Sequence, residues 1–181
     1  MQFRIALLLA FVIAAVPRAG AQSAAPDTAA RQAAMQKLAF LVGRWSGPAH
    51  ATVGRGEQLE MIQTEYVHYS IGGQVLVVEG TGRRAVSGAA ADTVFQAFGT
   101  IDWTPERGYL MRSYVRSGYV GEYALTVTPD GFAWGMPVPG GRIEYVMVHT
   151  PAGEWSERGQ FIMESGARVP TMAMKLTAVI N

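Results

Sequence analysis

After Trp45 the chain alternates hydrophobic and polar residues in short runs rich in Val, Ile, Tyr, Phe and Thr. Gly, Pro and Asp separate these runs at fairly even spacing and supply the backbone angles that tight hairpins need. No connecting segment has a helical period or the length of a crossover, so adjacent strands should pair antiparallel. The pattern predicts ten strands, at residues 44–53, 58–70, 74–83, 93–103, 109–116, 119–128, 132–136, 142–149, 155–163 and 171–180.

Ten strands linked by hairpins predict an all-β fold that closes into an antiparallel up-and-down barrel. An open sheet would leave two unpaired edges, and closure removes both. A β-sandwich is the alternative, but it normally needs longer connections than this chain has. Before the first strand, Ala34, Leu38 and Leu41 recur at helical spacing, which predicts a short helix within residues 31–42 that ends at Gly43 and covers one end of the barrel.

The first 21 residues have the pattern of a secretory signal peptide. A short basic start precedes an apolar run at residues 5–16, and Ala19-Gly20-Ala21 offers a cleavage site after Ala21. The run is shorter than the roughly 20 residues of a membrane-spanning helix. We therefore expect a signal peptide at 1–21, a disordered spacer at 22–30, and one lipocalin-like barrel domain at 31–181, in the periplasm or secreted.

Charge and cysteine content narrow the function classes. Removing Arg4 and Arg18 from the 15 basic and 14 acidic residues leaves 13 and 14, a net charge of −1, which favours no nucleic-acid partner. With no cysteine, disulfides, thiol catalysis and zinc-thiolate sites are excluded, so stability must come from a packed core. Neither a metal-ligand spacing nor a nucleophile elbow is present, and after signal cleavage no membrane span is expected.

The Gly43-Arg44-Trp45 stretch after a short helix resembles the Gly-x-Trp start of lipocalin-like barrels, the calycin superfamily. In those barrels a basic residue of the last strand packs over the tryptophan at the closed end. The resemblance implies that Trp45 and Lys175 close the barrel, with Lys175 inside the apolar stretch at 172–176.

A resemblance over nearly the whole mature chain is to the bacterial family called domain of unknown function 1579. The segments that carry it are LAFLVGRWSG at 38–47, GQVLVVEG at 73–80, MRSY at 111–114 and DGFAWG at 130–135. That resemblance implies the barrel fold and no particular activity.

The chain is more distantly similar to nitrobindin, a ten-stranded haem barrel that begins Gly-x-Trp-x-Gly-x-Gly. Gly43, Trp45 and Gly47 match, while Ala49 stands at the third glycine. The histidine that holds the haem iron near the end of that family's chains has no counterpart here, because no histidine follows His149. His68 or His149 would have to serve instead. No cofactor is therefore expected, and a haem barrel stays an alternative.

Alternation along residues 109–116 places Arg112 and Tyr114 on one face of their strand. If that face points inward, the pair forms a carboxylate anchor in an apolar cavity. If it points outward, Arg112 coats the surface and pairs with Glu122. The ligand-binding set is completed by aromatic residues that should line or border the cavity: Tyr66, Trp103, Tyr123 and Trp134.

These patterns predict an exported barrel that binds a small hydrophobic molecule, lipid-like or a metabolite, which can carry a carboxylate. A binding protein is favoured over an enzyme, and no catalytic residue is assigned. Two alternatives stay open. One is an enzyme in the same barrel, haem-dependent or with Glu, His and Tyr as acid–base groups. The other is a structural or partner-binding domain whose barrel is filled with side chains.

Overall fold

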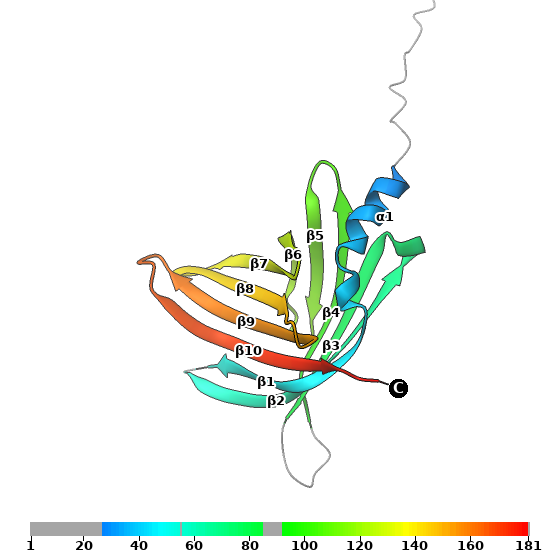
Figure 1. The fold of residues 1–181 in the computed structure, drawn as a ribbon. Helices are drawn as coiled ribbons and strands as arrows, with labels where there is room; N and C mark the ends of the chain where they lie inside the picture. The colour runs from blue at the N-terminus through cyan, green and yellow to red at the C-terminus, as the bar shows by residue number, and fades with distance from the viewer. Residues whose placement is uncertain (1–26, 55, 85–91, 181) are drawn as a thin grey trace, which may run out of the picture.

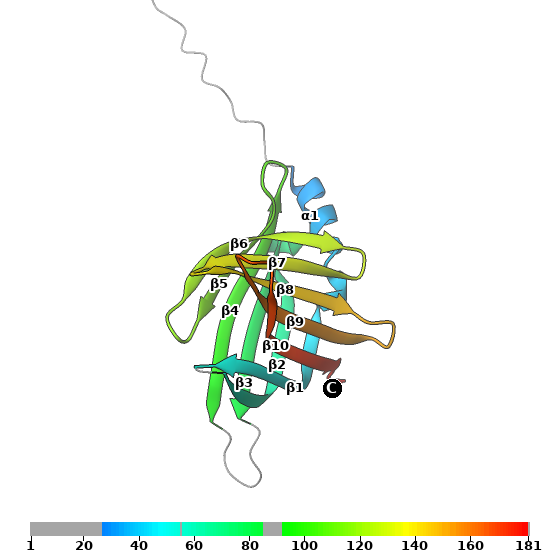
Figure 2. The same ribbon diagram turned by 90° about the vertical axis from the view of Figure 1, so that its left-hand side faces the viewer.

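The computed structural model describes residues 27–54, 56–84 and 92–180, and ten antiparallel strands of this part form a closed barrel (Figure 1). Each strand pairs with its neighbours in sequence, and the first pairs with the last, so the up-and-down barrel is confirmed and the sandwich is excluded. The strands are β1 (Gly43–Val53), β2 (Glu57–Ser70), β3 (Val75–Arg84), β4 (Thr93–Thr104), β5 (Gly108–Val115), β6 (Val120–Thr128), β7 (Gly131–Val138), β8 (Gly141–His149), β9 (Glu154–Met163) and β10 (Arg168–Ala178). In Figure 2, β6 to β9 cross in front of β3 and β4, which belong to the opposite wall.

The helical segment differs in detail from its prediction. An α-helix, α1 (Thr28–Gln36), begins within the predicted spacer because the Asp27 carboxylate caps it, accepting a hydrogen bond of 2.8 Å from the Ala30 N–H. A 3₁₀ turn, η1 (Ala39–Leu41), follows before the chain enters β1, and another, η2 (Ile71–Gly73), joins β2 to β3. No helix of the described residues is long and apolar enough to span a membrane. The predicted signal peptide at 1–21 lies outside the described residues.

One end of the barrel, here called the closed end, is packed by apolar side chains from α1, η1 and the strands. Met35, Leu38 and Leu41 are fully buried there against inward-facing Leu76 and Leu176. Two tyrosines fasten the helix: the Tyr109 hydroxyl donates to the Ala34 carbonyl at 2.7 Å, and the Tyr69 hydroxyl donates to the Met35 carbonyl at 3.0 Å. The N-terminal segment therefore plugs the barrel.

The seam between β1 and β10 depends on Gly47. A Cβ atom at this position would overlap the Lys175 carbonyl oxygen, which belongs to the backbone and cannot swing aside. Only glycine allows the two strands this approach. The second glycine of the Gly43-x-Trp45-x-Gly47 stretch thus serves barrel closure.

Candidate functional site

Two carboxyl groups lie inside the barrel, on strands that are far apart in the sequence. Glu65 of β2 and Glu157 of β9 are only 8% and 6% exposed. Glu65 shares the inner face of β2 with buried Met61, Gln63 and Val67, because alternate residues of a strand face the same side. A buried carboxyl is costly unless it is hydrogen-bonded or stays protonated, so this pair marks a site.

Each glutamate has one short hydrogen bond to its own strand. The Gln63 Nε2 donates to Glu65 Oε1 at 2.7 Å, and the Trp155 indole N–H donates to Glu157 Oε2 at 3.0 Å. No ion pair within the described residues involves either glutamate. The two carboxyls therefore rest on neutral donors and lack a cationic partner among these residues.

Burial raises the pKa of both carboxyls to about 7. For Glu65 the hydrogen bond from Gln63 opposes this rise, while the charge of Glu157 adds to it. For Glu157 the indoles of Trp155 and Trp134 oppose it. Both groups can thus gain or lose a proton near neutral pH.

Three aromatic rings on consecutive strands stack beside Glu157. The ring centroids of Tyr123 and Trp134 are 4.9 Å apart, and those of Trp134 and Tyr145 are 4.3 Å apart with only 15° between their planes. Burial, aided by the charges of Glu157 and Tyr123, raises the pKa of Tyr145 to about 12. The stack gives the inner wall a flat apolar surface next to a carboxyl group.

Gly80 of β3 makes room for the Glu65 side chain. A Cβ atom there would lie 2.8 and 2.9 Å from the two Glu65 carboxyl oxygens and 3.1 Å from the Gln63 Nε2. Any larger residue would displace the carboxyl from its place on the inner wall.

The end of the barrel opposite α1, here called the open end, is less tightly sealed. Phe95, which continues the inner face of β4, is 36% exposed, whereas the inward leucines at the closed end are 0% exposed. Other inner-face residues near this end keep intermediate exposure, namely Met136, Ile143, Phe161 and Met172. Inner apolar surface is thus accessible at the open end.

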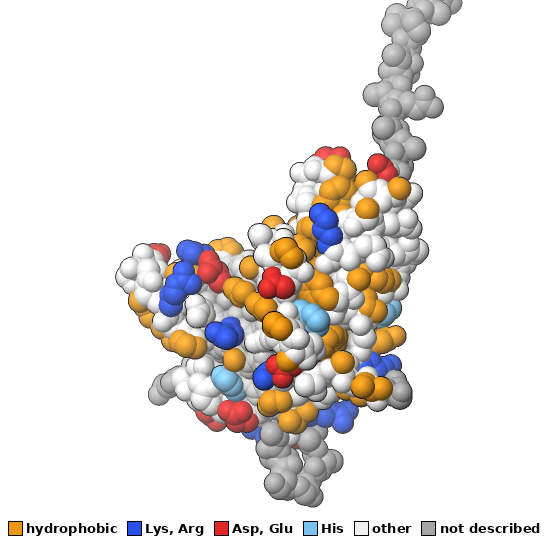
Figure 3. Space-filling view, viewed as in Figure 1, with side chains coloured by type: hydrophobic (Ala, Val, Ile, Leu, Met, Phe, Trp, Pro, Cys, Tyr) orange, Lys and Arg blue, Asp and Glu red, His pale blue; other side chains and the backbone are white. Residues whose placement is uncertain are grey.

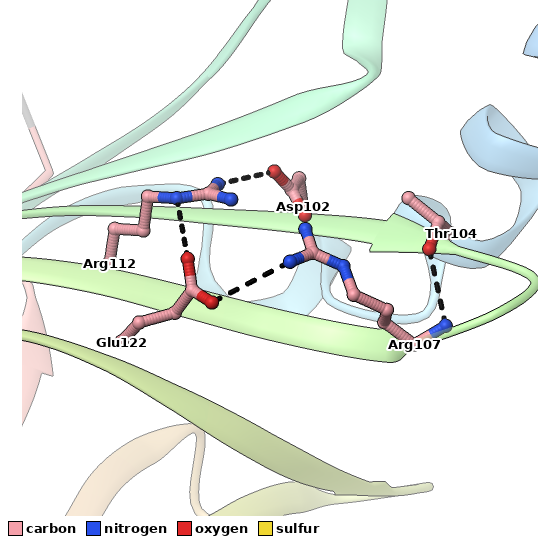
Figure 4. Close-up of polar contacts among 5 residues, drawn as sticks. All are labelled: Asp102, Thr104, Arg107, Arg112 and Glu122. Carbon is pink, nitrogen blue, oxygen red and sulfur yellow. Dashed lines mark hydrogen bonds and ion pairs between the residues drawn. The ribbon is translucent and has the colours of Figure 1, made fainter.

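The structure corrects the inward orientation considered for Arg112 and Tyr114. Tyr109 and Met111 of β5 pack against the core, so Arg112 and Tyr114 face outward. Figure 4 shows the reason: Arg112 lies between acidic residues of both neighbouring strands, 2.8 Å from Asp102 Oδ2 and 2.9 Å from Glu122 Oε2. The carboxylates beside Arg112 thus come from the protein, as the outward alternative predicted.

The four expected cavity aromatics divide between the two faces. Tyr123 and Trp134 belong to the inner stack, and Trp103 packs against the core nearer the closed end. Tyr66 faces outward, contrary to its prediction, because the inner positions of β2 are those of Glu65 and Val67. Its ring lies 4.2 Å below the Arg44 guanidinium carbon and stacks on His68 at 4.8 Å.

The predicted contact between Trp45 and Lys175 is wrong, although Trp45 itself lies at the closed end. Trp45 is 5% exposed, its indole N–H donates to the Leu41 carbonyl at 2.8 Å, and its ring meets Trp155 edge-on at 5.9 Å. Lys175 faces outward because its neighbours Met174 and Leu176 turn inward, and its amine pairs with Glu154 at 2.9 Å.

Neither histidine proposed as a haem ligand faces the open end. His68 lies on the outer face, stacked on Tyr66. His149 lies at the closed end, with its ring 5.7 Å from Phe40 and 6.0 Å from Trp45. Among the described residues no group of three or more His, Asp or Glu side chains could hold a metal ion.

Sequence reasoning missed Glu65, Glu157 and Gln63 as site residues, although a signal for them exists. In β2, Leu59, Met61 and Val67 share one parity, which is also that of Gln63 and Glu65. In β9, Trp155 and Phe161 likewise share the parity of Glu157. The apolar residues of each set identify the inner face of the strand. The polar residues of the same parity must therefore also face inward.

Two grooves lie on the outside of the barrel. The first, of about 530 Å³, crosses β6 to β8 and is lined by outward residues such as Thr126, Gly135 and Glu144. The second, of about 460 Å³, crosses β3 to β5 beside Phe98 and Tyr114. On the face seen in Figure 3, basic and acidic side chains lie close together, so no charge of one sign dominates it.

Comparison with known proteins supports the fold alone. Neither the family models nor the curated proteins searched give a match. The crystal structure of Rv2717c from M. tuberculosis is similar at 15% identity, with a TM-score of 0.60, covering 81% of this chain and 98% of that one. The S-type phycobiliprotein lyase CPES from Guillardia theta is similar at 10% identity, with a TM-score of 0.54, covering 81% and 92%. The architecture shared with these two structures is a closed antiparallel β-barrel.

Proposed function

We propose that the barrel binds a small, largely apolar molecule between its open end and the level of Glu65 and Glu157. The observation that carries this proposal is the contrast between the two ends. The closed end is sealed by fully buried leucines, whereas inner apolar side chains at the open end stay partly exposed. Exposed apolar surface on a concave wall is what a hydrophobic ligand covers.

The aromatic stack supplies the contact surface in this proposal. A planar or flexible apolar body can lie against Tyr123, Trp134 and Tyr145, which already hold each other in place. The resemblance in fold to other lipocalin-like barrels is consistent with such a role and does not identify the ligand.

Binding of 1-naphthalenemethanol, a neutral planar probe, tests the proposal. We expect saturable quenching of tryptophan fluorescence by the probe, and about tenfold weaker binding after Trp134→Leu, because one wall of the site is lost. Tyr114→Leu is the matched control, since Tyr114 is an exposed outer aromatic paired with Phe98 at 6.4 Å. If Tyr114→Leu loses binding and Trp134→Leu does not, the probe binds in the outer groove across β3 to β5. Absence of binding to the unaltered protein would overturn the proposal.

We also propose that the protein acts after export, in the periplasm or outside the cell, with residues 1–21 removed. The support is the basic start, apolar run and small residues of that segment. The intact mass of the protein recovered from the envelope fraction of an expressing cell tests this. A mass that begins at Gln22 is expected, and a chain that keeps residues 1–21 in the cytoplasm would overturn it.

A further inference from the structure

The two carboxyl groups inside the barrel decide which charge a ligand's polar end can carry. Arg112, the one cation assigned to the ligand by sequence, faces outward onto Asp102 and Glu122. Glu65 and Glu157 face inward instead. A ligand that enters from the open end therefore meets two carboxyl groups, which when ionised attract a cationic donor and repel a carboxylate.

Each glutamate accepts a hydrogen bond from its own strand at only one of its two carboxyl oxygens. Glu65 Oε1 accepts from Gln63, whereas Glu65 Oε2 accepts no hydrogen bond from the described residues. Neither glutamate is among the described residues with a fully enclosed, unpartnered polar atom, so this oxygen is not fully enclosed. A side chain that is 92% buried yet keeps an unpartnered acceptor that is not fully enclosed indicates a place for a ligand's N–H group.

We propose that the ligand is an amine or another molecule with cationic or N–H donor groups, and that this end lies against Glu65 and Glu157 while its apolar body lies on the Tyr123–Trp134–Tyr145 stack. This inference rests on the proposed function and names its ligand class. An ammonium group would supply the positive partner that the two carboxyls lack, in charge-assisted hydrogen bonds.

The affinity for a cation should depend on pH only through the carboxyls of Glu65 and Glu157, because the groups that surround them are uncharged. Gln63 from β2, Trp155 from β9, Trp134 from β7 and Tyr145 from β8 face the carboxyls, and Gly80 from β3 adds no side chain. All of these are uncharged near neutral pH. As the carboxyls lose their protons on passing a pKa of about 7, affinity for a cation should therefore rise.

Three naphthyl probes that differ only in their polar end test the proposal: 1-naphthylmethylammonium, the neutral 1-naphthalenemethanol and 1-naphthoate. At about pH 8 we expect the ammonium to bind about tenfold or more tightly than the alcohol, and the carboxylate most weakly. At about pH 5.5 the advantage of the ammonium should shrink while the affinity of the alcohol stays constant. Isothermal titration calorimetry gives all the dissociation constants.

Variants separate the proposed preference for an amine from the proposed binding of a small apolar molecule. The double change Glu65→Gln with Glu157→Gln keeps size and hydrogen bonding and should remove the ammonium's advantage without weakening the alcohol. Glu60→Gln, on the exposed face of β2, should change neither. If the alcohol binds and the ammonium binds no better, or 1-naphthoate binds best, the donor proposal is overturned and the binding function stands. If no probe binds, both fail.

Discussion

Gly80 is the residue on which the position of the Glu65 carboxyl depends most directly. Gly80→Ala would place a methyl group within 2.9 Å of both carboxyl oxygens and 3.1 Å from Gln63 Nε2. We expect this substitution to displace the Glu65 and Gln63 side chains and to cost about 1–3 kcal/mol in the free energy of unfolding, the range typical of overpacking, measured by urea denaturation.

Gly99 offers the matched control for Gly80. It is a buried strand glycine on β4, and a Cβ there would come no closer than 3.4 Å to its nearest neighbour, the Arg112 carbonyl oxygen. Gly99→Ala should therefore cost less than Gly80→Ala. Equal losses in the two variants would show that general strand strain, and not contact with Glu65, explains the effect.

How far the sequence predicts single residues depends on whether both faces of a strand look alike. In residues 109–115 apolar and polar side chains occur at both parities, so the pattern allows Arg112 to face either way. The choice is made by Asp102 and Glu122 on the neighbouring strands, whose register cannot be known before the fold. Glu157, by contrast, could be predicted from Trp155 and Phe161, which share its parity.

The helix α1 lies outside the sheet and is attached to it by two tyrosine hydroxyls in addition to apolar packing. The Tyr109 and Tyr69 hydroxyls donate second hydrogen bonds to the Ala34 and Met35 carbonyls near the end of α1. These carbonyls also accept from the backbone N–H groups of Lys37 and Leu38. Tyr109→Phe and Tyr69→Phe should each lower the free energy of unfolding by about 0.5–1.5 kcal/mol and speed hydrogen exchange in α1. Tyr119→Phe is the control, because its side chain is 77% exposed and makes no hydrogen bond among the described residues. If a variant that combines Tyr69→Phe with Tyr109→Phe leaves the hydrogen-exchange rate in α1 unchanged, apolar packing alone holds the helix.

Strands and the helical segment differ in how completely the sequence predicts them. Each strand is bounded by Gly, Pro or Asp at a hairpin, so all ten are found within a few residues. The helix begins earlier than its apolar pattern, because its first turn depends on the Asp27 cap and not on buried residues. It also ends earlier, at Gln36, and the 3₁₀ turn that follows carries Leu41 into the core. Capping and packing at the closed end decide these boundaries.

For the molecule as a whole, barrel closure could be predicted, whereas the meeting of side chains from distant strands inside it could not. Closure follows from ten strands in series, because any other arrangement leaves edges exposed. The interior depends on which parity faces inward across ten registers, and bulges at Gly82/Arg83 and Pro170/Met172 shift two of them. That Glu65 of β2 and Glu157 of β9 lie in one interior is therefore apparent only from the assembled barrel.

Two carboxyls buried on folding make the stability of the whole barrel depend on pH. Burial raises the pKa of both to about 7 in the folded chain, above the ordinary value of 4.5 for a glutamate. Between these values the folded state keeps protons that the unfolded chain has lost, so stability falls as pH rises and the loss is complete above about pH 8. We expect a decrease of about 3 kcal/mol for each carboxyl between about pH 5 and pH 8, measured by urea denaturation across that range. Glu65→Gln with Glu157→Gln should flatten this dependence, whereas Glu60→Gln on the outer face should keep it. A double variant that still loses stability like the unaltered chain would place the titrating groups elsewhere in the barrel.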